Sequence, residues 1–274
     1  MTRLAWALAL SAAAAAVAAT GLVLRARATL HFTYWAAPLS QSEYDALGSR
    51  PRWRNRSLEV EAGVVLRGLE RRPVSIDAPW ILFFPGNSST LLAEAQQFLD
   101  ALVGERDWGA VVWAYRGFDG SGGQPSPSVL ADDGWKAAEN LTRVEGCPRD
   151  RIHVVAFSLG TSVATAVSAR AASASFASIT LLAPLTKIDI GRAGWWSRAH
   201  RYETLSHLAA TVGPVLVVHG GADAVLPAEG GRLIAARLGL RARYVELASA
   251  GHIDLLQDPR AIDVIREFIR RQML

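Results

Sequence analysis

The stretch that decides the fold is Ala156-Phe157-Ser158-Leu159-Gly160. Residues 152–155 in front of it, Ile-His-Val-Val, predict a buried strand, and residues 161–167 behind it predict the first turns of a helix. A serine at a sharp turn from strand to helix exposes its hydroxyl, and small residues two positions before and after it avoid collisions there. The stretch therefore predicts a serine nucleophile and covalent acyl transfer. Because a pentapeptide of this kind also arises by chance, the rest of the sequence has to support the prediction.

Composition limits the classes of protein to be considered. The 274 residues are 50% hydrophobic and 20% charged, which predicts one sizeable globular domain with at most one membrane element. The net charge of +4 is spread along the chain, and no basic block carries interleaved aromatic residues, so we expect no nucleic-acid surface. Cys147 is the only cysteine, which excludes intrachain disulfides, thiolate metal clusters and paired-thiol redox chemistry. We interpret it as an inert residue before the turn at Pro148.

The N-terminal part of the chain differs from the rest. Leu4 to Leu24 is a run of 21 residues without a charge, long enough for a helix of roughly 30 Å. This length favours an uncleaved, single-pass transmembrane anchor over 1–27, followed by a connector over 28–56 and the main domain over 57–274. A signal peptide cleaved near residues 26–28, which would leave a secreted or periplasmic protein, is the alternative.

Basic residues near this segment leave the membrane orientation open. Arg3 and the terminal amine on one side balance Arg25 and Arg27 on the other. Four further arginines predict a solvated basic surface, with contact to anionic lipid headgroups as the alternative. They are Arg50, Arg52, Arg54 and Arg56.

From residue 57 onward, apolar runs alternate with helical patterns, which predicts an α/β fold with crossover helices. The apolar runs are continuous rather than alternating, as is typical of a mostly parallel sheet covered on both faces. The predicted strands are 64–69, 80–85, 110–115, 152–156, 179–183, 215–219 and 243–247, and the predicted helices are 90–102, 129–144, 161–171, 228–238 and 259–270.

Two polar residues follow later predicted strands. Asp223 comes after the strand 215–219, and His252 comes after the strand 243–247. The carboxyl ends of parallel strands meet at one edge of an open sheet, so we expect both side chains to lie near Ser158. In this arrangement His252 would take the proton of the serine, and Asp223 would hold the imidazole tautomer. Alone, each residue also fits an ordinary turn or surface position.

Residues 83–90, Phe-Phe-Pro-Gly-Asn-Ser-Ser-Thr, predict the site that would stabilise an oxyanion. Gly86 allows a close turn, and the backbone N–H groups of Asn87 and Leu159 would face the developing negative charge. A capped helix start at Ser88 or Ser89 is compatible with this role.

With these segments in place, residues 57–270 resemble the α/β-hydrolase superfamily. Within it, the chain resembles the hydrolases with an N-terminal membrane anchor and a small cap, which are similar to serine aminopeptidases and monoacylglycerol lipases. Besides the segments around Ser158, Asp223 and His252, the resemblance rests on residues 114–126 and on the Asp-x-Val-x-Pro pattern of 223–227. The sequence departs from the family in two places: Ala156 stands where glycine is usual, and Pro85-Gly86-Asn87 stands where His-Gly-Asn or His-Gly-Gly is common.

The resemblance also implies a substrate pocket and a short cap, inserted at 185–210 between the sixth and seventh strands of the family. The substrate pocket residues that we predict are Phe118, Phe157, Trp195 and Trp196. The two tryptophans would otherwise pack inside the cap. Asp189 is an alternative acid, but it lacks the Val-x-Pro context that follows Asp223.

The resemblance implies a serine hydrolase that cleaves carboxylic esters, including lipid esters or thioesters, through an acyl-enzyme intermediate. No metal or other cofactor is expected, and the substrate would be a small-molecule or lipid acyl compound. Two alternatives stay open, namely a serine peptidase of the aminopeptidase type and a catalytically silent, membrane-tethered interaction protein. The sequence does not indicate an oligomeric state.

Overall fold

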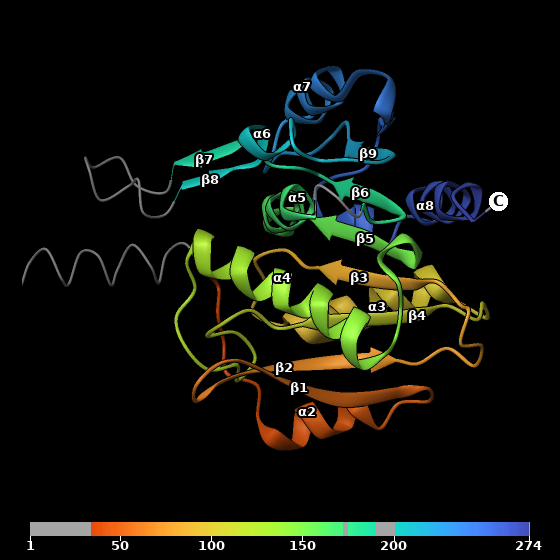
Figure 1. The fold of residues 1–274 in the computed structure, drawn as a ribbon. Coiled ribbons are helices and arrows are strands. Elements are labelled where there is room, and N and C mark those ends of the chain that lie inside the picture. Colours follow the sequence, from red (N-terminus) through yellow and green to blue (C-terminus); the bar gives the residue numbers. More distant parts are fainter. Residues whose placement is uncertain (1–33, 172–174, 190–200, 274) are drawn as a thin grey trace, which may run out of the picture.

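The computed structural model describes residues 34–171, 175–189 and 201–273. Its centre is an eight-stranded sheet with the order β1-β2-β4-β3-β5-β6-β9-β10 (Figure 1). The first two strands, β1 (Trp53–Glu61) and β2 (Val64–Arg71), pair antiparallel, and β2 pairs antiparallel with β4 (Gly109–Trp113). The other five pairings are parallel and join β4 to β3 (Trp80–Phe84), β5 (Ile152–Phe157), β6 (Ser178–Leu182), β9 (Val215–Gly220) and β10 (Ala242–Leu247) in that order.

The central strands are buried on both faces because helices cover them. Every residue of β3, β4, β5, β6 and β9 is buried, which explains their continuous hydrophobic sequence. Helix α4 (Pro127–Val144) packs against α5 (Leu159–Arg170), and α3 (Leu91–Val103) packs against α8 (Pro259–Arg271), while α7 (Glu229–Leu238) packs on β9 and β10 (Figure 1). The mostly parallel α/β sheet predicted from the sequence is confirmed.

Local signals explain where several helices begin. Ser126 caps α4 by accepting a hydrogen bond from a backbone N–H of the first turn, and Asp258 does the same for α8. In both helices proline occupies the first turn, where its missing N–H costs nothing. Short 3₁₀ segments at Arg149–Arg151, Gly239–Arg241 and Ile253–Leu256 complete the connections.

Sequence patterning missed two N-terminal elements. Helix α2 (Gln41–Gly48) and the start of β1 lie in the stretch that we assigned to a connector. Helix α2 packs on β1 and β2. β1 escaped prediction because polar and charged residues separate its three apolar residues, the buried Trp53 and Val60 and the half-buried Leu58.

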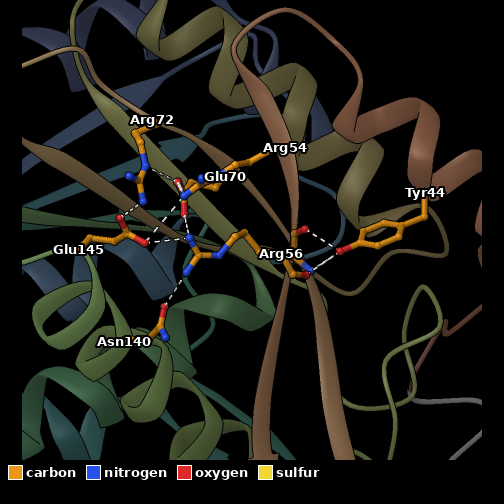
Figure 2. A network of polar contacts seen from close by, with 8 residues as sticks. Tyr44, Arg54, Arg56, Glu70, Arg72, Asn140 and Glu145 are labelled. Carbon is orange, nitrogen blue, oxygen red and sulfur yellow. Dashed lines mark hydrogen bonds and ion pairs between the residues drawn. The ribbon is translucent and has the colours of Figure 1, made fainter.

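Ion pairs compensate the charges of β1 (Figure 2). The buried carboxylate of Glu70 in β2 accepts hydrogen bonds from Arg54 at 2.5 Å and from Arg56 at 2.6 Å. Arg56 also donates to the buried Glu145 at 2.7 Å, directly after α4, and Arg72 bridges the two glutamates. Arg50, Arg52 and Arg54 are exposed, as the predicted solvated surface requires, whereas Arg56 is largely buried and joins the sheet to the end of α4.

Between β6 and β9 the chain forms a small addition to the fold. It contains a two-stranded antiparallel sheet, β7 (Lys187–Asp189) and β8 (Arg201–Glu203), and the short helix α6 (Thr204–His207). These elements all fall within residues 185–210, the range in which we predicted the cap. Within the described ranges, no helix has both the length and the apolar character needed to cross a bilayer, and the anchor predicted at 1–27 lies outside these ranges.

Candidate active site

Ser158 lies at the turn between β5 and α5, in a backbone conformation that non-glycine residues rarely adopt. Its φ is 50° and its ψ is −117°. The backbone N–H of Ser158 donates to the carbonyl of Leu182 at 3.0 Å, and its carbonyl accepts the Thr161 hydroxyl at 2.6 Å. These contacts hold the strained turn, in keeping with the concentration of such strain at functional sites.

The small residues around Ser158 have different tasks. A Cβ atom at Gly160 would lie 2.1 Å from the carbonyl oxygen of Phe84, so the helix approaches β3 more closely than any side chain permits. Ala156, at the position where the family usually has glycine, is fully buried in β5 and pairs with Phe84 and Leu181 on the neighbouring strands. The sheet therefore accommodates the extra methyl group of Ala156.

The structure brings the three predicted polar side chains into one chain of hydrogen bonds. The Nε2 atom of His252 lies 3.0 Å from Ser158 Oγ, and its Nδ1 atom lies 2.7 Å from Asp223 Oδ2. Asp223 follows β9 and His252 follows β10, so both stand at the carboxyl edge of the parallel strands. Asp189 ends β7 in the separate small sheet, whereas Asp223 makes the contact with His252.

The carboxylate of Asp223 is buried and strongly hydrogen-bonded. Its Oδ1 atom accepts the backbone N–H groups of Val225 and Leu226, both at 2.8 Å. Burial raises the pKa of Asp223, but the hydrogen bonds from Leu226, His252 and Val225 outweigh it and hold the pKa below its ordinary value. Asp223 is therefore ionised at neutral pH and favours a proton on Nδ1 of His252, which leaves Nε2 able to accept one from Ser158.

A second histidine, His219, supports the loop that follows β9 and carries Asp223. His219 is fully buried at the end of β9, and its Nε2–H donates to the carbonyl of Leu226 at 2.8 Å. The same Nε2 atom is 3.4 Å from Asp223 Oδ2. His219 therefore holds the carbonyl of Leu226, the residue whose own N–H binds the carboxylate.

Ser158 and His252 open into a largely apolar cavity of about 530 Å³. Asn87 and Leu159, the predicted donors to an oxyanion, line the same cavity, as does Phe157, whose ring lies 4.9 Å from that of His252. A Cβ atom at Gly86 would lie 2.8 Å from the Phe157 ring, which explains the need for glycine there. Of the predicted pocket residues with described side chains, only Phe157 lines the cavity.

Residues 85–92, from the end of β3 into the first turn of α3, are held by the loop that follows β4. The hydroxyl of Tyr115 donates to the carbonyl of Pro85 at 2.8 Å. Asp119 accepts the N–H of Leu92 at 2.6 Å, and burial raises the pKa of this carboxyl to about 6. The side-chain oxygen of Asn87 accepts the backbone N–H of Trp35 at 2.8 Å. The segment 114–126, which carries part of the family resemblance, thus supports one wall of the cavity.

One pocket prediction was wrong. Phe118 is completely buried and does not line the cavity, because its ring packs edge-on against Tyr34 and Tyr115. Trp195 and Trp196 lie outside the described residues.

Sequence reasoning did not find several residues that line the cavity. Leu226 lies three positions after Asp223, and Ile253 directly follows His252, so their proximity to those residues was available as a signal. Trp35 has no signal of this kind, because it reaches the cavity only through the tertiary fold.

Among the described side chains, no cluster of three histidine, cysteine or acidic residues could hold a metal ion. Cys147 is buried, and burial raises the pKa of its thiol to about 11.

No protein-family model matches the chain. Two curated proteins of Mycobacterium tuberculosis, from strains CDC 1551 and H37Rv, are each 30% identical over 168 residues, and both are described as uncharacterised. The match covers 58% of this chain and 59% of each relative. The chain thus matches these relatives over less than two thirds of their length.

Solved structures identify the fold. An esterase from Pyrococcus furiosus superimposes with a TM-score of 0.64 at 17% identity, covering 84% of this chain and 93% of that one. An α/β hydrolase from Vibrio vulnificus gives 0.63 at 17% identity, with 84% and 88% covered. The Pyrococcus horikoshii acylaminoacyl peptidase gives 0.64 at 17% identity, with 84% of this chain but 43% of the peptidase covered. The chain has the α/β-hydrolase fold.

Proposed function

We propose that this protein is a serine hydrolase that cleaves carboxylic esters through an acyl-enzyme intermediate. The observation that carries the proposal is the hydrogen-bonded series Asp223–His252–Ser158 at an apolar cavity, with the serine on a strained turn. An esterase and a peptidase have the same fold as this chain, which agrees with the proposed chemistry. The fold alone does not select a substrate.

In the proposed reaction Ser158 Oγ attacks the ester carbonyl while its proton passes to Nε2 of His252. The carbonyl oxygen becomes an oxyanion that the N–H groups of Leu159 and Asn87 stabilise. When the tetrahedral intermediate collapses, the bond to the leaving alkoxide breaks and His252 returns the proton to it. Water then attacks the acyl-enzyme by the same route, releases the acid and restores the serine. Asp223 stabilises the imidazolium in both halves of the cycle.

Reaction with a fluorophosphonate probe tests the proposal. The wild-type protein should become labelled at Ser158, and Ser158→Ala should not. Ser249→Ala is a matched control, because Ser249 is exposed beside Arg260 and does not line the cavity. If the wild type fails to react, or if Ser158→Ala reacts equally, the proposed nucleophile is wrong and a catalytically silent scaffold is favoured.

A peptidase of the aminopeptidase type is the second candidate, and one observation favours it. Glu94 is the only acidic residue among the described residues that line the cavity. A carboxylate in this position suits the ammonium group of an aminoacyl substrate. Hydrolysis of aminoacyl naphthylamides but not of nitrophenyl acyl esters would select the peptidase, and the opposite preference would select the esterase.

We also propose that residues 1–27 anchor the protein in a membrane, on the basis of the uncharged run Leu4 to Leu24. Alkaline carbonate extraction tests this proposal. An anchored protein stays in the membrane pellet at its full length, whereas a cleaved signal would release a shorter protein.

A further inference from the structure

Three large apolar side chains at the cavity are exposed to solvent. Trp35 is 63% exposed, Val225 65% and Ile253 61%, and all three line the cavity that holds Ser158 and His252. They come from three separate parts of the chain: the segment before α2, the loop after β9 and the start of the 3₁₀ segment after His252. We call these three residues the apolar rim. Exposed apolar residues grouped around a binding site are typical of an interaction surface.

The charges around the cavity indicate what kind of surface the rim would meet. No lysine or arginine is among the described residues that line the cavity, and Glu94 contributes a carboxylate. Arg54, Arg56 and Arg72 do not line the cavity, and Glu70 and Glu145 pair with them (Figure 2). Insertion of apolar side chains therefore suits this face better than attraction to anionic headgroups.

The chain also enters the domain at this face. The hydroxyls of Tyr34 and Tyr202 lie 2.5 Å apart, and the backbone N–H of Trp35 donates to the side-chain oxygen of Asn87. The carbonyl of Ala37 accepts the N–H of Asp119 at 3.1 Å. The uncharged N-terminal run ends at Leu24, eleven positions before Trp35. Eleven residues span at most about 40 Å even when fully extended, so an anchor in the bilayer would keep the rim close to the membrane surface.

We propose that the apolar rim inserts into the surface of the bilayer that holds the N-terminal anchor, so that the cavity opens directly onto lipid. The substrate would then be a lipid ester taken from the bilayer, a part of the proposal that rests on the hydrolase function proposed above. The tryptophan suits this position because indole rings prefer the boundary between water and hydrocarbon.

Site-directed fluorescence in the full-length protein tests the docking. Val225→Cys and Ile253→Cys, each labelled with an environment-sensitive maleimide, are reconstituted into phosphatidylcholine vesicles with and without brominated lipid. Val74→Cys is the matched control, because Val74 is 89% exposed in the connection that leads to the amino end of β3, away from the cavity. The native Cys147 is buried with a raised pKa and should not react, which the wild type checks.

The rim labels should show a blue shift and roughly threefold stronger quenching by brominated lipid than the label at position 74. Equal quenching at all three positions would refute the docking. A requirement for anionic phosphatidylglycerol in the vesicles would refute apolar insertion as its cause.

Activity provides a second, independent measurement. The double variant Val225→Ser/Ile253→Ser should lower the ratio of turnover on a long-chain ester in vesicles to turnover on a soluble butyrate ester by roughly tenfold. The exposed pair Val74→Ser/Ile76→Ser should leave this ratio unchanged. An equal loss on both substrates would refute uptake from the bilayer. If rim labels are quenched but Ser158 never reacts with fluorophosphonate, the docking stands and the lipid-ester substrate is refuted.

Discussion

The orientation of the Asp223 carboxylate makes the effect of a single substitution predictable. In Asp223→Asn the side-chain oxygen has a defined place, because the N–H groups of Val225 and Leu226 both point at the Oδ1 position from 2.8 Å. The new amide NH₂ must then occupy the Oδ2 position, 2.7 Å from Nδ1 of His252. Two donors cannot face each other, so Nδ1 becomes the acceptor and the imidazole proton moves to Nε2.

A proton on Nε2 prevents His252 from accepting the proton of Ser158, 3.0 Å away. Turnover should fall by about 10⁴-fold, which corresponds to roughly 5 kcal/mol of transition-state stabilisation. Steady-state hydrolysis of nitrophenyl butyrate measures this loss. Asp254→Asn is the matched control, because the side-chain oxygen of asparagine can still accept the N–H of Gly251 as Asp254 does at 2.8 Å.

Activity of Asp223→Asn above a tenth of the wild-type value would refute this reasoning, whereas a comparable loss in Asp254→Asn would indicate general damage to the loop.

The stability of the fold offers a further check on the direction of the pKa shift of Asp223. The pKa of Asp223 is lowered in the folded state, so its ionisation stabilises the fold above the unfolded pKa of about 4. The advantage of the wild type over the variant in free energy of unfolding should therefore shrink as the pH falls below about 4.

Two further substitutions test features outside the catalytic series. Glu145→Gln removes a negative charge that pairs with Arg56 and Arg72, and urea denaturation should show a loss of about 1–3 kcal/mol in the free energy of unfolding. Glu139→Gln is the control, because its partner Arg143 is exposed on the same helix, and it should cost less than about 0.5 kcal/mol. Equal losses would refute the structural role of the ion-pair cluster. Burial raises the pKa of Asp119 to about 6. Between about pH 4 and 6 the folded state therefore keeps a proton that the unfolded chain has released. The free energy of unfolding consequently falls as the pH rises through this window. Asp119→Asn should flatten this part of the stability profile, and an unchanged slope would contradict the raised pKa.

Much of the fold could be predicted because its strands are buried on both faces. The five fully buried strands are short and largely apolar, a pattern that the sequence displays without reference to other segments. β1 could not be found in this way. Its arginines pair with Glu70 on the neighbouring strand and with Glu145, which lies 89 positions from Arg56 along the chain.

The positions of Ser158, Asp223 and His252 could be predicted from the ends of strands, because parallel strands bring their carboxyl ends to one edge. The walls of the cavity could not be predicted equally well. Phe118 and Phe157 are both aromatic residues beside family motifs, yet one is enclosed by tyrosines and the other faces His252. Their different environments depend on packing between segments that are distant in sequence.

By itself, the sequence determined the order of the strands from β2 to β10 that form the main sheet and of the five helices that cover it, the strand-to-helix turn at Ser158 and the order Ser158, Asp223, His252. These properties depend on local hydrophobicity and on small residues at single positions. Only the tertiary structure decided that Ala156 fits a glycine position, that Asn87 meets Trp35, and that Trp35, Val225 and Ile253 share one exposed rim. Such neighbours come from separate parts of the chain, and their contact exists only once the sheet has brought those parts together.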